Sequence, residues 1–233
     1  MKLTVLGNYG PYPPAGGACS SYFIEAGGLK ILIDMGSGSL AELQKKHSLF
    51  DLDVIILTHL HFDHMGEIQL LKYAYSSAGQ VKKPLLMMPD SPQDMYSQVA
   101  DKRFEIHIVK DGMKCSLSGV NFDFMEVPHP FMCYAVSIAH GGSRLVFSAD
   151  TSDSSALIRF AENADLFLID ACLLERDKKK ASLHFTVKEA CELGRTAKRT
   201  LLTHFSPRYS KDEIASEVCF GAELSEKGRE YKF

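Results

Sequence analysis

The chain has 233 residues and a formal net charge of −3 at neutral pH, with 45% apolar and 24% charged residues. These values suit one globular domain and argue against a generic nucleic-acid binder, although a local basic patch is compatible with them. No apolar run approaches a membrane span, and the first residues, MKLTVLGNYGPYPP, lack the sustained apolar stretch of a signal peptide. The six cysteines form no C-x-x-C pair. We therefore expect reduced thiols in a cytoplasmic protein without a membrane partner.

Apolar periodicity and turn residues predict the elements of the first half of the chain. LTVLG, residues 3–7, predicts a strand that stops at glycine, and the Pro- and Gly-rich residues 8–18 predict a loop. SYFIEAGGLKILIDMG, residues 21–36, predicts two strands joined by a Gly-Gly turn. The elements after this hairpin are predicted helices over 39–47, 67–79 and 91–100 and strands over 53–58, 84–89 and 105–110.

The second half repeats the pattern with different lengths, and its last residues give no clear signal. Its predicted elements are strands over 120–127, 133–140, 144–150, 166–171 and 199–205 and helices over 154–164, 186–197 and 211–218. Strands therefore come in runs joined by hairpins, with helices between them, in two blocks of roughly 1–115 and 116–233 without a linker. This order favours one α/β domain over residues 1–233, a four-layer αββα sandwich with helices outside two facing sheets.

The motif THLHFDHMG, residues 58–66, follows a buried strand and gathers three imidazoles and a carboxylate. Residues two apart in an extended chain point the same way, so His59 and His61 can reach one cation together. The chain then turns, which directs Asp63 and His64 elsewhere and indicates two ions. A polar surface loop is the alternative, but imidazole and carboxylate are the ligands that zinc takes in proteins. The cluster therefore favours a metal site.

Three further candidates stand where other apolar strands end. His129 follows FMEV, Asp150 ends LVFSAD, and His204 ends TLLTH. Such strand ends can bring loops together into a site on a rigid scaffold. A lone histidine after a strand is more often a surface or hydrogen-bonded residue, so His129 gains weight only from the cluster. A carboxylate such as Asp150 can bridge two cations and complete the coordination of both.

The order of these segments resembles the metallo-β-lactamase superfamily over nearly the whole chain. LIDMG, THLHFDH, His129, SADTS and LLTHFS follow one another as in that family, and the resemblance is closest to its ribonuclease Z-like branch. It implies a homodimer and a centre with two metal ions. The implied ligands are His59, His61 and His129 for one ion, Asp63, His64 and His204 for the second, and Asp150 as the bridge.

The resemblance also implies roles for three residues around the metal ligands. Asp34, in LIDMG, would be a buried carboxylate that orients the histidine loop, although capping of the following turn is an equal alternative. His184 stands before a predicted helix, which it could simply cap. In the branch a histidine there acts with an acidic residue at the preceding strand end, where this chain has Asp170 and the branch more commonly has Glu. We expect His184 to protonate the leaving oxygen or stabilise phosphoryl charge, with Asp170 holding its tautomer.

Other charged residues are weaker candidates. The run Lys178, Lys179 and Lys180 is expected to be a solvated loop, with attraction of an anionic substrate as the alternative. Arg208, in SPRY, could attract such a substrate close to His204. The histidines without partners in sequence, expected to be structural, are His47, His107 and His140.

The expected chemistry is metal-dependent hydrolysis. Two divalent ions about 3.5–4 Å apart activate water and neutralise charge on an attacked phosphorus or carbonyl carbon. Zinc suits the nitrogen and oxygen ligands best, with manganese or iron as alternatives, and Asp63 is expected both to bind metal and to orient the attacking group. Ribonuclease Z proteins that mature tRNA carry a long arm and an N-terminal basic motif, and neither is visible here. We therefore expect a phosphodiesterase acting on a small anionic phosphodiester or a short nucleic acid. The alternatives are a thioester or lactone hydrolase and a non-catalytic metal-binding regulatory protein.

Overall fold

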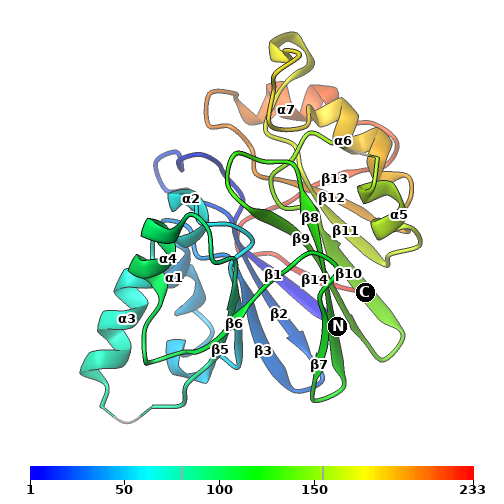
Figure 1. Ribbon diagram of the computed structural model, residues 1–233. Helices are drawn as coiled ribbons and strands as arrows, with labels where there is room; N and C mark the ends of the chain where they lie inside the picture. Colours follow the sequence, from blue (N-terminus) through cyan, green and yellow to red (C-terminus); the bar gives the residue numbers. More distant parts are fainter. Residues whose placement is uncertain (80, 154) are drawn as a thin grey trace.

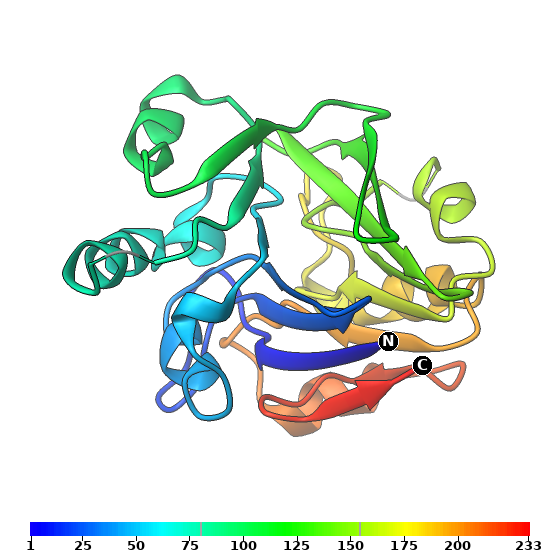
Figure 2. The same ribbon diagram turned by 90° about the horizontal axis from the view of Figure 1, so that it is seen from below.

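The computed structural model describes residues 1–79, 81–153 and 155–233. Two seven-stranded sheets face each other, and helices lie on the outer side of each sheet (Figures 1 and 2). The predicted four-layer α/β sandwich is therefore confirmed. Among the described helices, none combines the length and hydropathy that crossing a bilayer requires.

The first sheet has the order β14-β1-β2-β3-β4-β5-β6. Strands β1, β2 and β3 are antiparallel neighbours, whereas β3 to β6 run parallel, so β1, β3, β4 and β5 end at the same edge. The strands are β1 (Lys2–Gly7), β2 (Ser21–Ala26), β3 (Leu29–Ile33), β4 (Val54–Ile56), β5 (Leu85–Met88), β6 (Glu105–Ile108) and β14 (Glu230–Lys232).

The second sheet has the order β13-β12-β11-β10-β9-β8-β7. An antiparallel meander from β7 to β10 leads into parallel strands from β10 to β13, so β8, β10, β11 and β12 end at one edge. The strands are β7 (Lys114–Leu117), β8 (Val120–Val127), β9 (Cys133–His140), β10 (Ser143–Phe147), β11 (Leu166–Asp170), β12 (Thr200–Thr203) and β13 (Glu223–Leu224).

The helices divide between the two outer faces (Figure 1). The first sheet carries α1 (Ser39–Leu43), α2 (Phe62–Met65), α3 (Ile68–Ser77) and α4 (Gln93–Val99), and the second carries α5 (Leu157–Ala161), α6 (Val187–Gly194) and α7 (Lys211–Glu217). Two short 3₁₀ helices span Leu49–Asp51 and Glu175–Asp177.

The continuous apolar runs of the central strands follow from burial on both faces of the sheet. In β4, Val54 and Ile56 join the core between the sheets, whereas Ile55 joins the core beneath α1, α3 and α4. Successive side chains of a strand point to opposite faces. A strand covered on both sides therefore needs apolar residues along its length, as in VII of β4 and in LFLI of β11, which then ends at Asp170.

The structure differs from the predicted elements mainly at edges and ends. Strands β7, β13 and β14 were not predicted, because each is short and at least partly exposed. Strands β13 and β14 also pair with strands that are distant in sequence, whereas β7 pairs with the neighbouring β8. The helix predicted over 39–47 ends at Leu43 and continues as turns. The helix predicted over 154–164 is described only over Leu157–Ala161, and Ser154 lies outside the described residues.

Candidate metal centre

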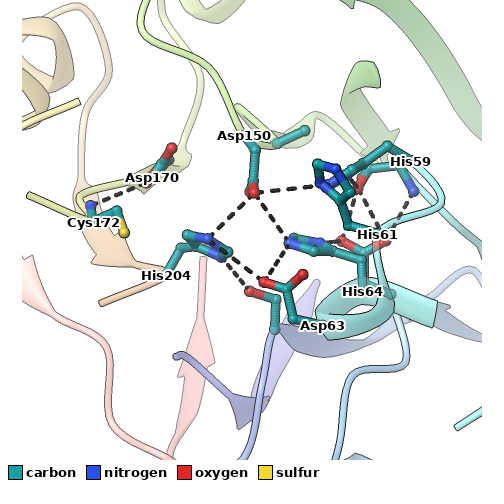
Figure 3. A network of polar contacts seen from close by, with 12 residues as sticks. His59, His61, Asp63, His64, Asp150, Asp170, Cys172 and His204 are labelled. Atoms are coloured by element: carbon teal, nitrogen blue, oxygen red, sulfur yellow. Dashed lines mark hydrogen bonds and ion pairs between the residues drawn. The ribbon is translucent and has the colours of Figure 1, made fainter. Parts of the chain in front are cut away.

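The predicted site residues meet at the edge where the parallel strands of both sheets end (Figure 3). His59 follows β4, His129 follows β8, and Asp150 follows β10, whereas Asp170 ends β11 and His204 follows β12. The motif turns into α2 after His61, which carries Asp63 and His64 back toward the same point. Segments that are far apart in sequence therefore supply one site.

The first donor group consists of His59, His61 and His129. His61 Nδ1 lies 3.0 Å from His59 Nε2 and 3.1 Å from His129 Nε2. Burial lowers the pKa of His59 well below its usual value and that of His129 to about 4. The imidazoles are therefore neutral at pH 7, which is the protonation state that binds metal.

The second donor group consists of Asp63, His64, Asp150 and His204. Asp150 Oδ2 lies 3.3 Å from both His64 Nε2 and His204 Nε2, and 3.8 Å from His59 Nε2 in the first group. Asp63 Oδ2 lies 3.6 Å from His64 Nε2. One oxygen of Asp150 thus stands between the two groups (Figure 3).

Two buried atoms of this group lack hydrogen-bond partners among the described residues, namely His64 Nε2 and Asp150 Oδ1. Buried polar atoms are rarely left unpaired without a reason. Burial opposes ionisation of Asp150, but the His204 and His64 charges outweigh it and hold the pKa of that carboxyl well below its usual range. A carboxylate facing convergent imidazole nitrogens is compatible with divalent metal binding.

Asp34 lies behind the histidine loop and accepts hydrogen bonds from it. It is fully buried, and its Oδ2 accepts a hydrogen bond from His64 Nδ1 at 2.7 Å. It also accepts from the Thr58 backbone N–H at 2.8 Å and from the Thr58 hydroxyl at 2.9 Å. Because that hydroxyl proton points to Asp34, Thr58 Oγ1 accepts from His59 Nδ1 at 3.1 Å. Asp34 therefore directs the Nε2 atoms of His64 and His59 into the site.

Two supporting residues were missed in the sequence. Thr58 belongs to the motif and ends its strand, so its place beside His59 could have singled it out. Ser20 Oγ lies 2.8 Å from His204 Nδ1 across 184 positions of sequence, and no local pattern distinguishes this serine. Gly10 also packs on the His204 ring, where a Cβ would come within 2.0 Å of Cε1. The position of His204 thus depends on the loop that follows β1.

His184 and Asp170 form a hydrogen-bonded pair next to the second donor group. His184 Nδ1 lies 2.7 Å from Asp170 Oδ2, and the His184 ring stacks on His204 with centroids 5.2 Å apart. Burial raises the pKa of Asp170 to about 6. Burial alone would lower the pKa of His184, but the Asp170 carboxylate raises it to about 9. The shared proton therefore belongs on the His184 imidazole. Asp170 reaches His184 Nδ1 although its side chain is shorter than that of the Glu more common in the branch.

The weaker candidates lie outside both donor groups. Lys178 Nζ donates to Glu189 Oε2 at 2.6 Å and to the His184 carbonyl at 3.1 Å, so it supports the His184 loop. His47 packs on Phe23, His140 contacts the Gly119 carbonyl, and His107 lies on β6. All six cysteines are free.

The sequence around these residues is similar to that of known proteins. A family profile described as "Beta-lactamase superfamily domain" matches residues 30–205, a range that contains both donor groups and the His184–Asp170 pair. YhfI of Bacillus subtilis (strain 168), named a probable metallo-hydrolase, is 32% identical over 229 residues, which cover 94% of this chain and 92% of YhfI. The YhfI crystal structure matches with a TM-score of 0.91 and 27% identity, covering 99% of each chain.

Relatives with a more specific name are more distant. A ribonuclease Z of Haloarcula marismortui is 26% identical in an alignment that covers 99% of this chain and 96% of that protein. The crystal structure of the short form of human tRNase Z matches with a TM-score of 0.79 and 21% identity, covering 100% of this chain and 99% of that one. At this identity the second likeness bears on the fold alone.

Proposed function

This chain belongs to the beta-lactamase superfamily, and we propose that it is a metal-dependent phosphodiesterase with two divalent cations that acts on a small phosphodiester or a short nucleic acid. The main support is the pair of donor groups that meet at Asp150, with His184 and Asp170 directly beside them. A relative named ribonuclease Z supports phosphodiester chemistry in a chain of this kind.

The donor sets suggest how the two cations would be held. His59, His61 and His129 would hold one, and Asp63, His64 and His204 would hold the other, with Asp150 shared. Nitrogen and oxygen donors suit zinc best, and manganese or iron accept the same set. When bound, the cations supply Lewis acidity and lower the pKa of water toward neutrality.

The remaining steps fall to side chains of the protein. Asp170 holds Nδ1 of His184, so the opposite ring nitrogen is free to give a proton to the leaving oxygen. The raised pKa of His184 keeps that proton in place at neutral pH. Asp63 is only 9% exposed at its side chain and would orient the attacking group beside His64. Together these residues favour an ester whose leaving group is a strong base, such as the alkoxide of a phosphodiester.

Substrate comparison tests this function. Purified protein loaded with Zn²⁺ should hydrolyse bis(p-nitrophenyl) phosphate faster than S-lactoylglutathione. His61→Ala should abolish that activity, whereas His107→Ala, an exposed histidine on β6, should retain it. Hydrolysis of the thioester alone would support a thioesterase of the same fold. Tight metal binding without hydrolysis of either compound would support a regulatory protein.

A further inference from the structure

The metal centre is closed on one side and open on the other. The fully buried histidines form its floor, namely His59, His64 and His204. His61 and His129 are only half-buried, and the His184 side chain is 22% exposed. The His129 ring lies close to both of the others, with its centroid 4.9 Å from that of His61 and 5.7 Å from that of His184. A ligand therefore reaches the donor groups through the opening that these three exposed rings mark.

Two phenylalanines border the opening on the His61 side. Phe62 stands in the motif between His61 and Asp63, and it is 62% exposed. Phe131 follows His129 by two positions and is half-buried, and its ring packs on the His61 ring with centroids 4.2 Å apart. Each phenylalanine is thus next to a metal donor, and part of its ring is free to contact a ligand.

Leu183 borders the opening on the His184 side. It directly precedes His184 and is 45% exposed. Single exposed apolar residues are ordinary on a protein surface, whereas several around one opening mark a binding site. These three residues, Phe62, Phe131 and Leu183, are named here the apolar rim. Because the rim is continuous with the donor groups, its occupant is part of the molecule that reacts there.

The places of the proton donor and of the phenylalanines assign the two ester groups of a phosphodiester. The leaving oxygen must lie at His184, which gives it a proton in the proposed mechanism, so Leu183 borders the leaving group. The His61 side of the opening is then left for the retained ester group, and there Phe131 packs directly on a donor. A ring attached to the retained ester oxygen reaches this side, whereas a nucleobase stands one sugar farther from the phosphorus.

We propose that the apolar rim binds an aromatic group attached to the retained ester oxygen, and so selects aryl phosphodiesters over alkyl phosphodiesters. The inference rests on the proposed phosphodiesterase function. The aryl ring lies against Phe62 and Phe131 in the offset or edge-to-face contact that aromatic rings prefer.

The test compares two esters with the same leaving group. The values of kcat/KM of the Zn²⁺-loaded protein are measured for phenyl p-nitrophenyl phosphate and for methyl p-nitrophenyl phosphate. Both esters release p-nitrophenolate, so damage to the metal centre lowers both values and leaves their ratio unchanged. Phe62→Leu should lower the ratio of phenyl to methyl ester about two- to tenfold, which is what one aromatic pair contributes. Phe62→Tyr keeps the ring and should keep the ratio.

Two further variants complete the comparison. Phe131→Leu should lower the same ratio, and Zn²⁺ titration shows whether its contact with His61 also affects metal binding. Phe220→Leu is the matched control, because Phe220 is 63% exposed but packs on Arg195, with the guanidinium carbon 4.9 Å from its ring centroid. It should leave the ratio unchanged. Thermal unfolding establishes that each variant is folded.

A binding experiment does not depend on turnover. Calorimetry compares phenyl phosphate with methyl phosphate, the products that retain the two ester groups, on the Zn²⁺-loaded protein. Phenyl phosphate should bind more tightly, and Phe62→Leu should reduce that difference. The p-nitrophenyl ester of thymidine 5′-monophosphate serves as a third substrate and tests a nucleobase as the occupant.

The outcomes separate the two proposals. If both esters are hydrolysed with one ratio in all variants, the phosphodiesterase function stands and the role of the apolar rim is overturned. The role of the rim is also overturned if Phe62→Leu lowers kcat/KM for the thymidine ester but not for the phenyl ester, relative to the methyl ester. If neither ester is hydrolysed but Phe62→Leu removes the preference for phenyl phosphate, the rim stands and the phosphodiesterase function is wrong. A ratio that falls in Phe62→Leu and recovers in Phe62→Tyr supports both.

Discussion

Replacement of Asp34 by asparagine should weaken metal binding by the second donor group and leave metal binding by the first group nearly unchanged. The Asp34 carboxylate is fully buried and accepts from His64 Nδ1, from the Thr58 N–H and from the Thr58 hydroxyl. Asparagine has the same shape but only one acceptor oxygen. If that oxygen keeps the Thr58 N–H, the new NH₂ group faces His64 Nδ1, where two donors cannot meet. His64 must then accept at Nδ1 and carry its proton on Nε2.

The magnitude follows from the bonds that change. Loss of one hydrogen bond to a buried charged group should lower the free energy of unfolding of the metal-free protein by about 1.5–3 kcal/mol. A proton on His64 Nε2 removes one donor from the second group, whereas His59, His61 and His129 keep theirs. Removal of an orienting partner costs about 10–100-fold in metal affinity. We expect this loss for the second ion, with the first ion bound nearly as in the natural protein.

Titration of metal-free protein with Zn²⁺ against a chromophoric chelator measures both affinities, and ¹⁵N NMR of the histidines reports the His64 tautomer. Asp165→Asn is the matched control, because Asp165 also accepts a backbone N–H, from Arg144 at 2.8 Å, but lies outside both donor groups. Two unchanged Zn²⁺ affinities in folded Asp34→Asn would refute the reasoning, as would an unchanged His64 tautomer.

Three further changes test other parts of the site. His184→Gln should slow the hydrolysis of an alkyl phosphodiester about 100-fold or more. It should slow the hydrolysis of a p-nitrophenyl ester far less, because p-nitrophenolate leaves without a proton. Equal losses of rate on both esters would argue against His184 as a proton donor. Gly10→Ala should weaken Zn²⁺ binding and lower the free energy of unfolding by about 1–3 kcal/mol, because the added Cβ would lie 2.0 Å from the His204 ring. An unchanged free energy of unfolding in urea would show that the loop after β1 can shift without cost. Thr186→Ala removes the capping box of α6, in which the Thr186 hydroxyl accepts from the Glu189 N–H at 3.1 Å, and should cost about 1 kcal/mol in urea unfolding. Thr186→Ser should recover most of that loss.

The central strands could be predicted because burial on both faces of a sheet requires a continuous run of apolar residues. The run VII and the first four residues of LFLID are apolar throughout, and each belongs to a buried strand. The edge strands could not be predicted in this way. Strand β14 is defined by its pairing with β1 across more than 200 positions, and β7 is short and mostly exposed. Nothing local distinguishes such segments from loops.

The sequence by itself determined the donors. The spacing of THLHFDH marks four of them, and His129, Asp150 and His204 were recognisable as polar residues that end apolar strands. Only the tertiary structure decided how they meet, including the place of Asp150 Oδ2 between the two groups and the support of His204 by Ser20. The physical reason is that the sequence states the chemical type of each side chain directly. A distance of about 3 Å between residues of two sheets depends instead on how those sheets pack.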